Sequence, residues 1–336
     1  MCFSLFFIAD NSLYEVKKDG ELWELKERKH PYAFHCLSLD PTREGRLYAG
    51  SFDHGLLFSD DYGRNFQKVG EGISSDRVLS LAVSIDEDGR SRVWAGTEPS
   101  ELFCSKDGGK SWTNFPELPK LPSHTSWSFP PRPYTHHVQS IQVDLLEAER
   151  IFVGIELGGV MRSMDGGETW EDRKEASQHD CHTLTMNEKT EDRIYEAAGG
   201  GFAESRDGGA TWKTDNEGLG DYTYLVDIQT DPDDGDVIIA SAAKSARTAY
   251  QPSRAHTVLV RKEGDAPWEI ISEGLPVADG SSIFSLISRP QEGSSFYAVN
   301  NLGLYHSIDQ GRSWEKVPLR LPGDFKEKRI RALVAS

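Results

Sequence analysis

An eight-residue pattern, Ser-x-Asp-x-Gly-x-x-Trp, recurs along this chain and limits what the chain can fold into. Five copies begin at Ser59, Ser105, Ser163, Ser205 and Ser307, and the first of them has Phe66 where the others have Trp. The Asp can accept hydrogen bonds from backbone N–H groups of its own turn, and the Gly can take the positive φ that a hairpin loop needs. The Trp would begin the next strand and pack back over the turn. The pattern therefore predicts a structural β-hairpin turn, called the aspartate turn below, with these residues in structural roles: Asp61, Asp107, Trp112, Asp165, Trp170, Asp207, Trp212, Asp309 and Trp314.

Short apolar runs separated by turn residues surround each copy. They predict six units of four strands each, over residues 34–69, 77–115, 137–173, 182–214, 224–272 and 283–317. These units recur at about the spacing of 40–50 residues that is typical of four-stranded propeller blades. Two segments, 116–135 and 243–257, interrupt the spacing and are predicted to be insertions.

The two ends of the chain predict one further blade. The chain begins with three predicted strands, 3–9, 13–17 and 22–26, and ends with a lone inner-type strand, 329–335. Pairing the ends would close the ring and protect its sheet edges. We therefore predict an all-β, single-domain, seven-bladed β-propeller over residues 1–336, built from four-stranded antiparallel blades, with the first blade closed by the N- and C-terminal strands. The alternative is six blades with an irregular terminal region.

The repeated pattern resembles the Asp-box (BNR) repeat of sialidase-like β-propellers. That superfamily includes sialidases, other glycoside hydrolases, sortilin-type receptors and photosystem assembly factors. In it the repeat lies at the outer rim of a blade, away from the active site, so the resemblance implies a fold and not an activity. True sialidases have six blades and carry an Arg-Ile-Pro motif, and this chain lacks that tripeptide. The chain looks most like a seven-bladed bacterial branch of these proteins, and sialidase activity is not expected.

The net charge of the chain and its cysteine content limit the partners and the cellular compartment to expect. The chain carries 37 basic and 54 acidic residues, for a formal net charge of −17, which argues against a nucleic-acid or anionic-membrane partner. The apolar start, residues 1–8, lacks the basic region and the length of a signal peptide. The four cysteines share no metal-binding spacing and are too few for a disulfide scaffold. A soluble, cytoplasmic protein is expected.

A ligand site is predicted at one mouth of the central channel, where the innermost strands begin. Histidines concentrate at these strand starts, and the two insertions are predicted to be loops over the same mouth. The predicted ligand-binding residues are His35, Arg77, Trp127, His136, Tyr224 and His256. Asp180, Arg329 and Arg331 also fall at strand starts, without an assigned role. The alternative for the aromatic residues of 116–135 is that they seal a gap between blades.

Three residues from neighbouring blades suggest chemistry at this mouth. His137, Glu156 and His182 would offer imidazole and carboxylate ligands to a divalent metal ion, or a catalytic acid and base. Glu98 and Asp53 are further catalytic carboxylates to consider for glycoside cleavage. Against these roles, channel histidines often bond only to backbone or water, and acidic residues are common in turns.

These observations leave three functional hypotheses. The first is a propeller that binds a small polar, carbohydrate-like ligand at the channel mouth and hydrolyses it. The second is a non-catalytic scaffold that holds a protein partner. The third is a metal-dependent enzyme that uses the His/Glu site, with a divalent metal ion as its cofactor. Whether catalysis occurs is left open by the sequence.

Overall fold

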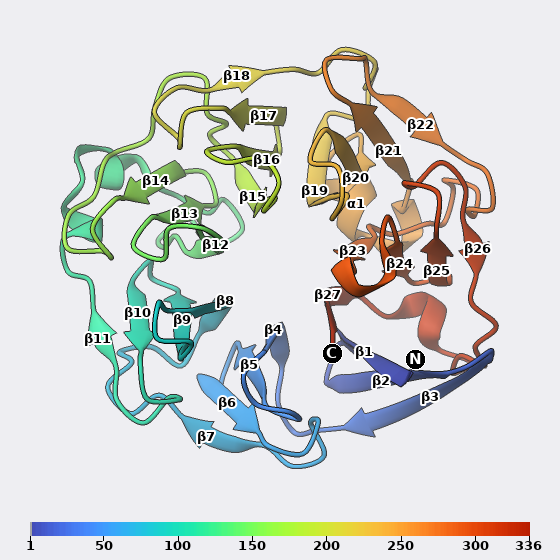
Figure 1. The fold of residues 1–336 in the computed structure, drawn as a ribbon, viewed down its shortest axis with the longest axis horizontal. Helices are drawn as coiled ribbons and strands as arrows, with labels where there is room; N and C mark the ends of the chain where they lie inside the picture. Colours follow the sequence, from blue (N-terminus) through green and yellow to red (C-terminus); the bar gives the residue numbers. More distant parts are fainter. Residues whose placement is uncertain (1) are drawn as a thin grey trace.

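The computed structural model describes residues 2–336, which form seven antiparallel sheets arranged in a ring around a central channel (Figure 1). The predicted seven-bladed β-propeller is confirmed, and the six-bladed alternative is wrong. Blade 1 consists of β1 (Cys2–Ala9), β2 (Ser12–Asp19), β3 (Leu22–Lys29) and the C-terminal β27 (Ile330–Ala335). Blade 2 consists of β4 (Phe34–Leu39), β5 (Leu47–Ser51), β6 (Leu56–Ser59) and β7 (Gln67–Val69). Blade 3 consists of β8 (Val78–Ile85), β9 (Ser91–Thr97), β10 (Leu102–Ser105) and β11 (Thr113–Asn114).

The other four blades complete the ring. Blade 4 consists of β12 (Val138–Val143), β13 (Ile151–Ile155) and β14 (Gly159–Ser163). Blade 5 consists of β15 (Cys181–Met186), β16 (Ile194–Ala198), β17 (Gly201–Ser205) and β18 (Lys213–Thr214). Blade 6 consists of β19 (Tyr224–Thr230), β20 (Val237–Ala243), β21 (Thr257–Glu263) and β22 (Glu269–Ile271). Blade 7 consists of β23 (Ser285–Ser288), β24 (Phe296–Asn300), β25 (Gly303–Ser307) and β26 (Glu315–Lys316).

The second strand of each blade carries the core. Strands β5, β13, β16, β20 and β24 are buried along their whole length. Their sequences are nearly continuous apolar runs, because each blade is covered on both faces by its neighbours. The outermost strands, such as β11 and β18, are exposed. The fold therefore places its apolar layers between blades and its exposed strands at the rim.

The ends of the chain close the ring as predicted. Strand β27 pairs antiparallel with β1, with Leu5 opposite Ala335, and the Ser336 N–H donates to the Ser4 carbonyl at 2.9 Å. Figure 1 shows β27 on the channel side of β1. The pairing matters for function because it places the C-terminal residues Arg329 and Arg331 beside the channel.

Blade 4 differs from the prediction, because residues 169–173 do not form a fourth strand. Pairing is reduced to one bridge between Arg162 and Glu171. Directly after Glu171, the Asp172 carboxylate accepts a hydrogen bond from the Ser123 N–H at 2.8 Å. Ser123 belongs to the insertion 116–135, so this contact draws the segment toward the insertion and ends its pairing with β14.

The aspartate turns have the hydrogen bonds that their sequence predicts. Asp107 accepts from the Lys110 and Ser111 N–H groups, both at 2.9 Å, and from the Ser111 hydroxyl at 2.6 Å. The Trp112 indole N–H donates to the Gly109 carbonyl at 3.1 Å, and Gly109 has a φ of 93°. These bonds, the Ser111 hydroxyl first, lower the pKa of Asp107 to about 2. The turn joins the third and fourth strands of its blade, at the outer rim of the ring (Figure 1).

Both insertions are present, and each contains short helices. The 3₁₀ helices η1 (Leu118–Lys120) and η2 (Pro122–Ser126) lie in the first insertion. Helix α1 (Ala246–Tyr250) and the 3₁₀ helix η3 (Pro252–Arg254) lie in the second, and Ser245 caps α1. The remaining 3₁₀ helices are η4 (Pro290–Glu292) and η5 (Phe325–Glu327). Within residues 2–336 no helix has both the length and the apolar character that crossing a bilayer requires.

Candidate functional site

A cavity of about 380 Å³ lies where the inner strands begin. Strands β4, β8, β12, β19 and β27 contribute to its wall, and so do both insertions, through Phe129 and Arg132 on one side and Ala246 and Tyr250 on the other. The lining residues are His35, Phe52, Leu79, Phe129, Pro131, Arg132, His137, Gln139, Glu156, Tyr224, Ala246, Tyr250, Arg329 and Arg331. We call this space the channel cavity. Its size is in the range of small-molecule sites.

A recurring β-bulge aims side chains at this cavity. The pairing register skips one residue near the start of the inner strands β4, β8 and β12, and the skipped residues are His35, Leu79 and Gln139. All three line the channel cavity. A bulge leaves one residue outside the ladder and redirects its side chain. Strands β15 and β19 carry the same bulge, at His182 and Val226.

Arg331, in β27, and Arg329, directly before it, give one side of the cavity a positive charge. Arg331 donates from Nη1 to His35 Nδ1 at 3.2 Å, and its guanidinium lies 5.1 Å from the Phe52 ring centroid. The Arg329 guanidinium lies 4.2 Å from the Tyr250 ring centroid. Within residues 2–336, neither guanidinium forms an ion pair with a carboxylate. Burial and the nearby Arg329 lower the pKa of Arg331 to about 10, so Arg331 still carries its charge at neutral pH.

His35 accepts this hydrogen bond in its neutral form. Burial, first, and the Arg331 charge, second, place the pKa of His35 well below its usual value. A neutral imidazole with an acceptor at Nδ1 carries its proton at Nε2. His35 therefore contributes a neutral group to the wall, and the charge on that side belongs to the arginines.

Glu98, one of the predicted catalytic carboxylates, forms ion pairs with two arginines. It is 2% exposed and accepts from Arg77 Nη1 at 2.6 Å and from Arg132 Nε at 2.9 Å. Burial raises its pKa, but the hydrogen bonds from Arg132 and Arg77 outweigh burial and leave the pKa lowered. Glu98 is therefore ionised and shielded. It fixes Arg132, and with it the first insertion, against blade 3, and the predicted ligand residue Arg77 is part of the same contact.

His137 lies between two acceptors. Its Nε2 is 2.9 Å from Glu156 Oε2 and 3.0 Å from Gln139 Oε1. The hydrogen bond of Nε2 goes to Gln139, so the contact with Glu156 is a close approach of the imidazole to the carboxylate without a hydrogen bond. The Phe129 ring, from the first insertion, packs against the imidazole with 4.8 Å between centroids. The structure thus places His137 beside Glu156.

Glu156, Asp180 and His182 converge at the junction of blades 4 and 5. One ligand atom from each lies within 4.8 Å of the other two. Of the three residues predicted as a metal set, the structure brings Glu156 and His182 together, and the third member of the group is Asp180 instead of His137. Burial disfavours the charged form of His182, but the Asp180 carboxylate outweighs burial and raises the pKa of His182.

Tyr224 lines the channel cavity, whereas two other predicted ligand residues lie outside its wall. The Tyr224 ring centroid is 4.7 Å from that of His182. Trp127 is 5% exposed, belongs to a hydrophobic core cluster, and donates from its indole N–H to Ser123 Oγ at 2.9 Å. His136 packs against Trp127 at 5.5 Å and bonds through Nδ1 to Ser100 Oγ at 2.9 Å. Both residues occupy the packing between the first insertion and its blades, as in the alternative that the aromatic residues seal a gap.

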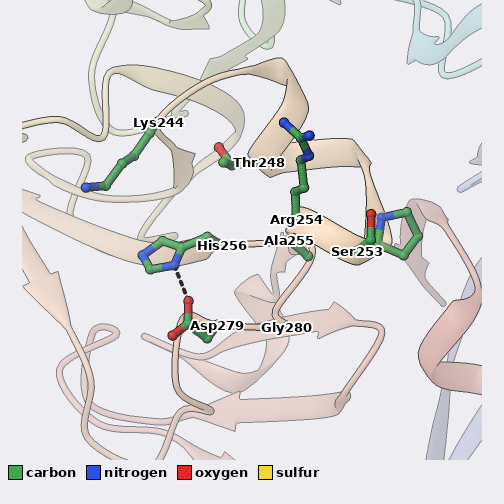
Figure 2. A pocket seen from close by; sticks show the side chains of 9 residues that line it. Lys244, Thr248, Ser253, Arg254, Ala255, His256, Asp279 and Gly280 are labelled. Atoms are coloured by element: carbon green, nitrogen blue, oxygen red, sulfur yellow. Dashed lines mark hydrogen bonds and ion pairs between the residues drawn. The ribbon is translucent and has the colours of Figure 1, made fainter.

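His256 lies in a second cavity, of about 470 Å³, on the other side of helix α1. Figure 2 shows its hydrogen bond to Asp279, and Nδ1 is 2.6 Å from Asp279 Oδ1. One helical turn separates Ala246 from Tyr250, which both face the channel cavity, whereas Thr248 lines the second cavity. Helix α1 therefore divides the two spaces.

The last predicted carboxylate, Asp53, lines neither cavity. It contacts the His54 imidazole at 2.7 Å, and its side chain is 49% exposed. Sequence reasoning assigned no role to Asp180, Arg329 or Arg331, although all three are at strand starts. The place of Arg331 at the start of the closing inner strand was visible in the sequence, but its hydrogen bond to His35 across the blade junction was not.

Comparisons with known proteins identify the fold of the chain but do not assign it to a family. No family model matches the chain, and no curated protein matches it significantly. An ancestral GH74 enzyme superposes with a TM-score of 0.65 at 17% identity, over 87% of this chain and 39% of that one. The GH74 enzyme of Niastella koreensis gives 0.64 at 16% identity, over 92% of this chain and 53% of that one. The chain therefore spans only about half the length of these enzymes or less.

A third solved structure matches along nearly its whole length. YCF48 bound to D1 peptide gives a TM-score of 0.57 at 16% identity, over 91% of this chain and 93% of that one. At such identities, likeness extends to the propeller fold and does not carry an activity. The fold is thus shared by carbohydrate-active enzymes and by a peptide-binding protein.

Proposed function

We propose that this protein binds a small polar ligand with an anionic group in the channel cavity. The observation that carries the proposal is the pair Arg329 and Arg331 on the cavity wall, with no carboxylate partner in residues 2–336. Arginine binds carboxylates and phosphates through paired N–H donors. A ligand carboxylate would supply the acceptors that the protein does not.

The contrast with the buried arginines of the chain supports this assignment. Arg46, Arg150 and Arg193 are buried, whereas Arg329 and Arg331 are only partly buried, and each of the buried three is paired with a carboxylate of the protein. In a chain with a net charge of −17, acidic partners are abundant. Two neighbouring arginines without such a partner raise the local positive potential, which attracts an anion.

The rest of the wall fits a carbohydrate-like body. Phe52, Phe129, Tyr224 and Tyr250 offer aromatic surface, and Gln139 offers an amide. Amphipathic rings combined with a few polar groups are typical of sites for polar organic ligands. A sugar acid combines an anionic group with such a body, and it is the ligand class that we propose.

Hydrolysis of that ligand has weaker support than binding. Glycosidases use two carboxyl groups that flank the scissile bond. Glu156 is the one carboxylate among the described residues of the cavity wall, and Glu98 is shielded by Arg77 and Arg132. We therefore propose ligand binding as the primary function. An assay for the hydrolysis of aryl glycosides would test whether the protein also cleaves its ligand.

Calorimetric titration with galacturonate, and with neutral galactose as the matched ligand, tests the proposal. We expect galacturonate to bind to the wild type, galactose to bind at least about tenfold more weakly, and Arg331→Ala to lose the preference for the acid. Arg312→Ala is the control, because Arg312 is half exposed at the rim. Equal affinities for the two sugars, or an unchanged preference in Arg331→Ala, would overturn the proposal.

The C-terminal carboxylate of a peptide could bind the same arginines, and this would agree with the scaffold hypothesis. Titration with a short peptide, free or amidated at its C-terminus, separates the two sources. Binding of the free peptide in preference to galacturonate, lost in Arg331→Ala, would assign the cavity to a protein partner. Binding of neither anion would leave the arginines without the proposed role.

A further inference from the structure

We infer that Glu156, Asp180 and His182 form a binding site for one divalent transition-metal ion. The site goes beyond the anion site and does not depend on it. The three residues come from two neighbouring blades: Glu156 directly follows β13, Asp180 directly precedes β15, and His182 lies in the bulge of β15. Their ligand atoms lie within 4.8 Å of one another.

The tautomer of His182 is the first argument. Its Nδ1 is 2.6 Å from the Leu225 carbonyl oxygen, which can only accept. Nδ1 therefore carries a proton, and in the neutral ring that a metal ligand requires, Nε2 presents a lone pair. A backbone carbonyl that receives Nδ1–H is the usual arrangement behind a metal-ligating histidine, because it fixes the ring and raises the basicity of the other nitrogen.

The second argument is that this lone pair has no partner. His182 is 3% exposed, and Nε2 makes no hydrogen bond within residues 2–336. The nearest carboxylate oxygen, Asp180 Oδ2, is 3.6 Å away, which is too long for a hydrogen bond. Asp180 Oδ1 also lacks a partner. Buried polar atoms without partners are rare and require an explanation, and an ion between them supplies one.

Charge is the third argument. Two carboxylates this close favour a positive charge between them, and a bound cation supplies it when the His182 imidazole is neutral. Within residues 2–336, the imidazole of His137 approaches the Glu156 carboxylate to 2.9 Å but forms its hydrogen bond with Gln139.

The donor set selects the class of ion. One imidazole with two carboxylates suits Zn²⁺ or Mn²⁺ better than Ca²⁺ or Mg²⁺, which prefer oxygen ligands alone. Three protein ligands leave at least one coordination position open. Since Glu156 also lines the channel cavity, that position would face the space in which the ligand is proposed to bind.

Metal analysis of untagged protein tests the inference. After dialysis against a chelator and removal of the chelator, the wild type is titrated with ZnCl₂ by calorimetry, and with MnCl₂ while the spectrum of free Mn²⁺ is recorded. We expect about one equivalent of one of these ions per chain, and at least about a 100-fold weaker affinity in Asp180→Asn and in His182→Gln. His137→Gln, which removes a neighbour of Glu156 and no ligand, should weaken binding less than either of these variants.

A second histidine–carboxylate pair provides the matched control. His256 and Asp279 contact each other beside the second cavity, and neither belongs to the converging group. The double variant His256→Gln/Asp279→Asn should bind the ion like the wild type. If Asp180→Asn fails to fold, Glu156→Gln replaces it, because Glu156 lies partly exposed at the cavity wall.

Two results would overturn the inference. One is the absence of binding of either ion to the wild type. The other is binding that persists in His182→Gln and Glu156→Gln, whatever the control pair shows. X-ray absorption at the zinc edge gives an independent readout, with one nitrogen and two carboxylate ligands expected in the wild type. Because no sugar is present in these titrations, failure of the metal site and failure of the anion site are distinguishable.

Discussion

The rim and the channel of this propeller differ in how far their polar groups are paired within the protein. At the rim, each aspartate turn satisfies its own donors and acceptors within eight residues, as the bonds from Lys110 and Ser111 to Asp107 show. In the channel, Arg329 and Arg331 lack a carboxylate partner among residues 2–336, and His182 Nε2 lacks any hydrogen-bond partner there. The Asp107 turn is complete by itself, whereas these channel groups would find partners in the ligands that we propose.

The difference separates stability from function. A polar group that is fully paired inside the fold contributes to holding that fold, whereas a buried unpaired group costs free energy. Such a cost is tolerated where a ligand recovers it. Substitutions at the rim should therefore change stability and leave ligand binding intact, and substitutions in the channel should do the reverse.

The largest effect is expected for Trp314→Ala at the rim. Trp314 is 3% exposed, and its indole N–H donates to the Gly311 carbonyl at 3.1 Å. Its loss should lower the free energy of unfolding by about 3–5 kcal/mol, measured by urea denaturation. Trp112→Ala is the matched control, because Trp112 makes the same bond but is only partly buried and should cost less. Equal losses would show that burial is not the source of the effect.

Arg331→Ala should show the opposite behaviour. Loss of one charged pair of donors should weaken galacturonate binding by about 10–100-fold. The melting temperature should stay the same or rise, because a partly buried charge without a carboxylate partner is removed. A clear fall in melting temperature would mean that Arg331 holds the fold, and the comparison between rim and channel would then break.

Asp165→Ala should cost less than Trp314→Ala. Asp165 accepts from the Thr169 N–H at 2.9 Å and from the Ser163 hydroxyl at 2.8 Å, at an exposed turn. Removing these bonds should lower the free energy of unfolding by about 1 kcal/mol and leave the affinity for galacturonate unchanged. Chemical denaturation together with calorimetry checks both statements, and a weaker affinity for the sugar acid would contradict the second.

The smallest effect is a pH dependence at the rim. The pKa of Asp107 is lowered to about 2 in the folded protein, from an ordinary value of 3.8. A lowered folded pKa contributes stability that is present above pH 4 and is lost as the pH falls toward 2. Asp107→Asn should therefore flatten the loss of stability between pH 4 and pH 2, measured as urea midpoints. A profile identical to that of the wild type would exclude this contribution.

Much of the fold could be predicted from the sequence because its determinants are local. Each aspartate turn carries its complete hydrogen-bond pattern in eight residues, and the closure of blade 1 follows from the strand count at the two ends. The missing fourth strand of blade 4 could not be predicted, because it depends on Asp172 meeting Ser123 from the first insertion. That contact is nonlocal and leaves no pattern in the sequence.

The sequence placed the candidate site at the channel mouth, but it did not give the contacts among the side chains there. The strand starts placed His35, His137 and Tyr224 at one mouth of the channel, and all three line the channel cavity, while their role in binding a ligand stays a prediction. A strict two-residue alternation, however, assigns the wrong face to side chains at a bulge, because one extra residue inverts the alternation. The bulge at His182 directs this residue toward Asp180, and this pairing replaced His137 in the converging group.

A crystal structure of the protein grown with galacturonate tests the central claim most directly. The account predicts density for the sugar acid in the channel cavity, with its carboxylate within hydrogen-bonding distance of the Arg331 guanidinium and its ring against Phe129 or Tyr250. Density for the sugar in the second cavity beside His256, or at the rim turns, with the channel cavity unchanged, would contradict it.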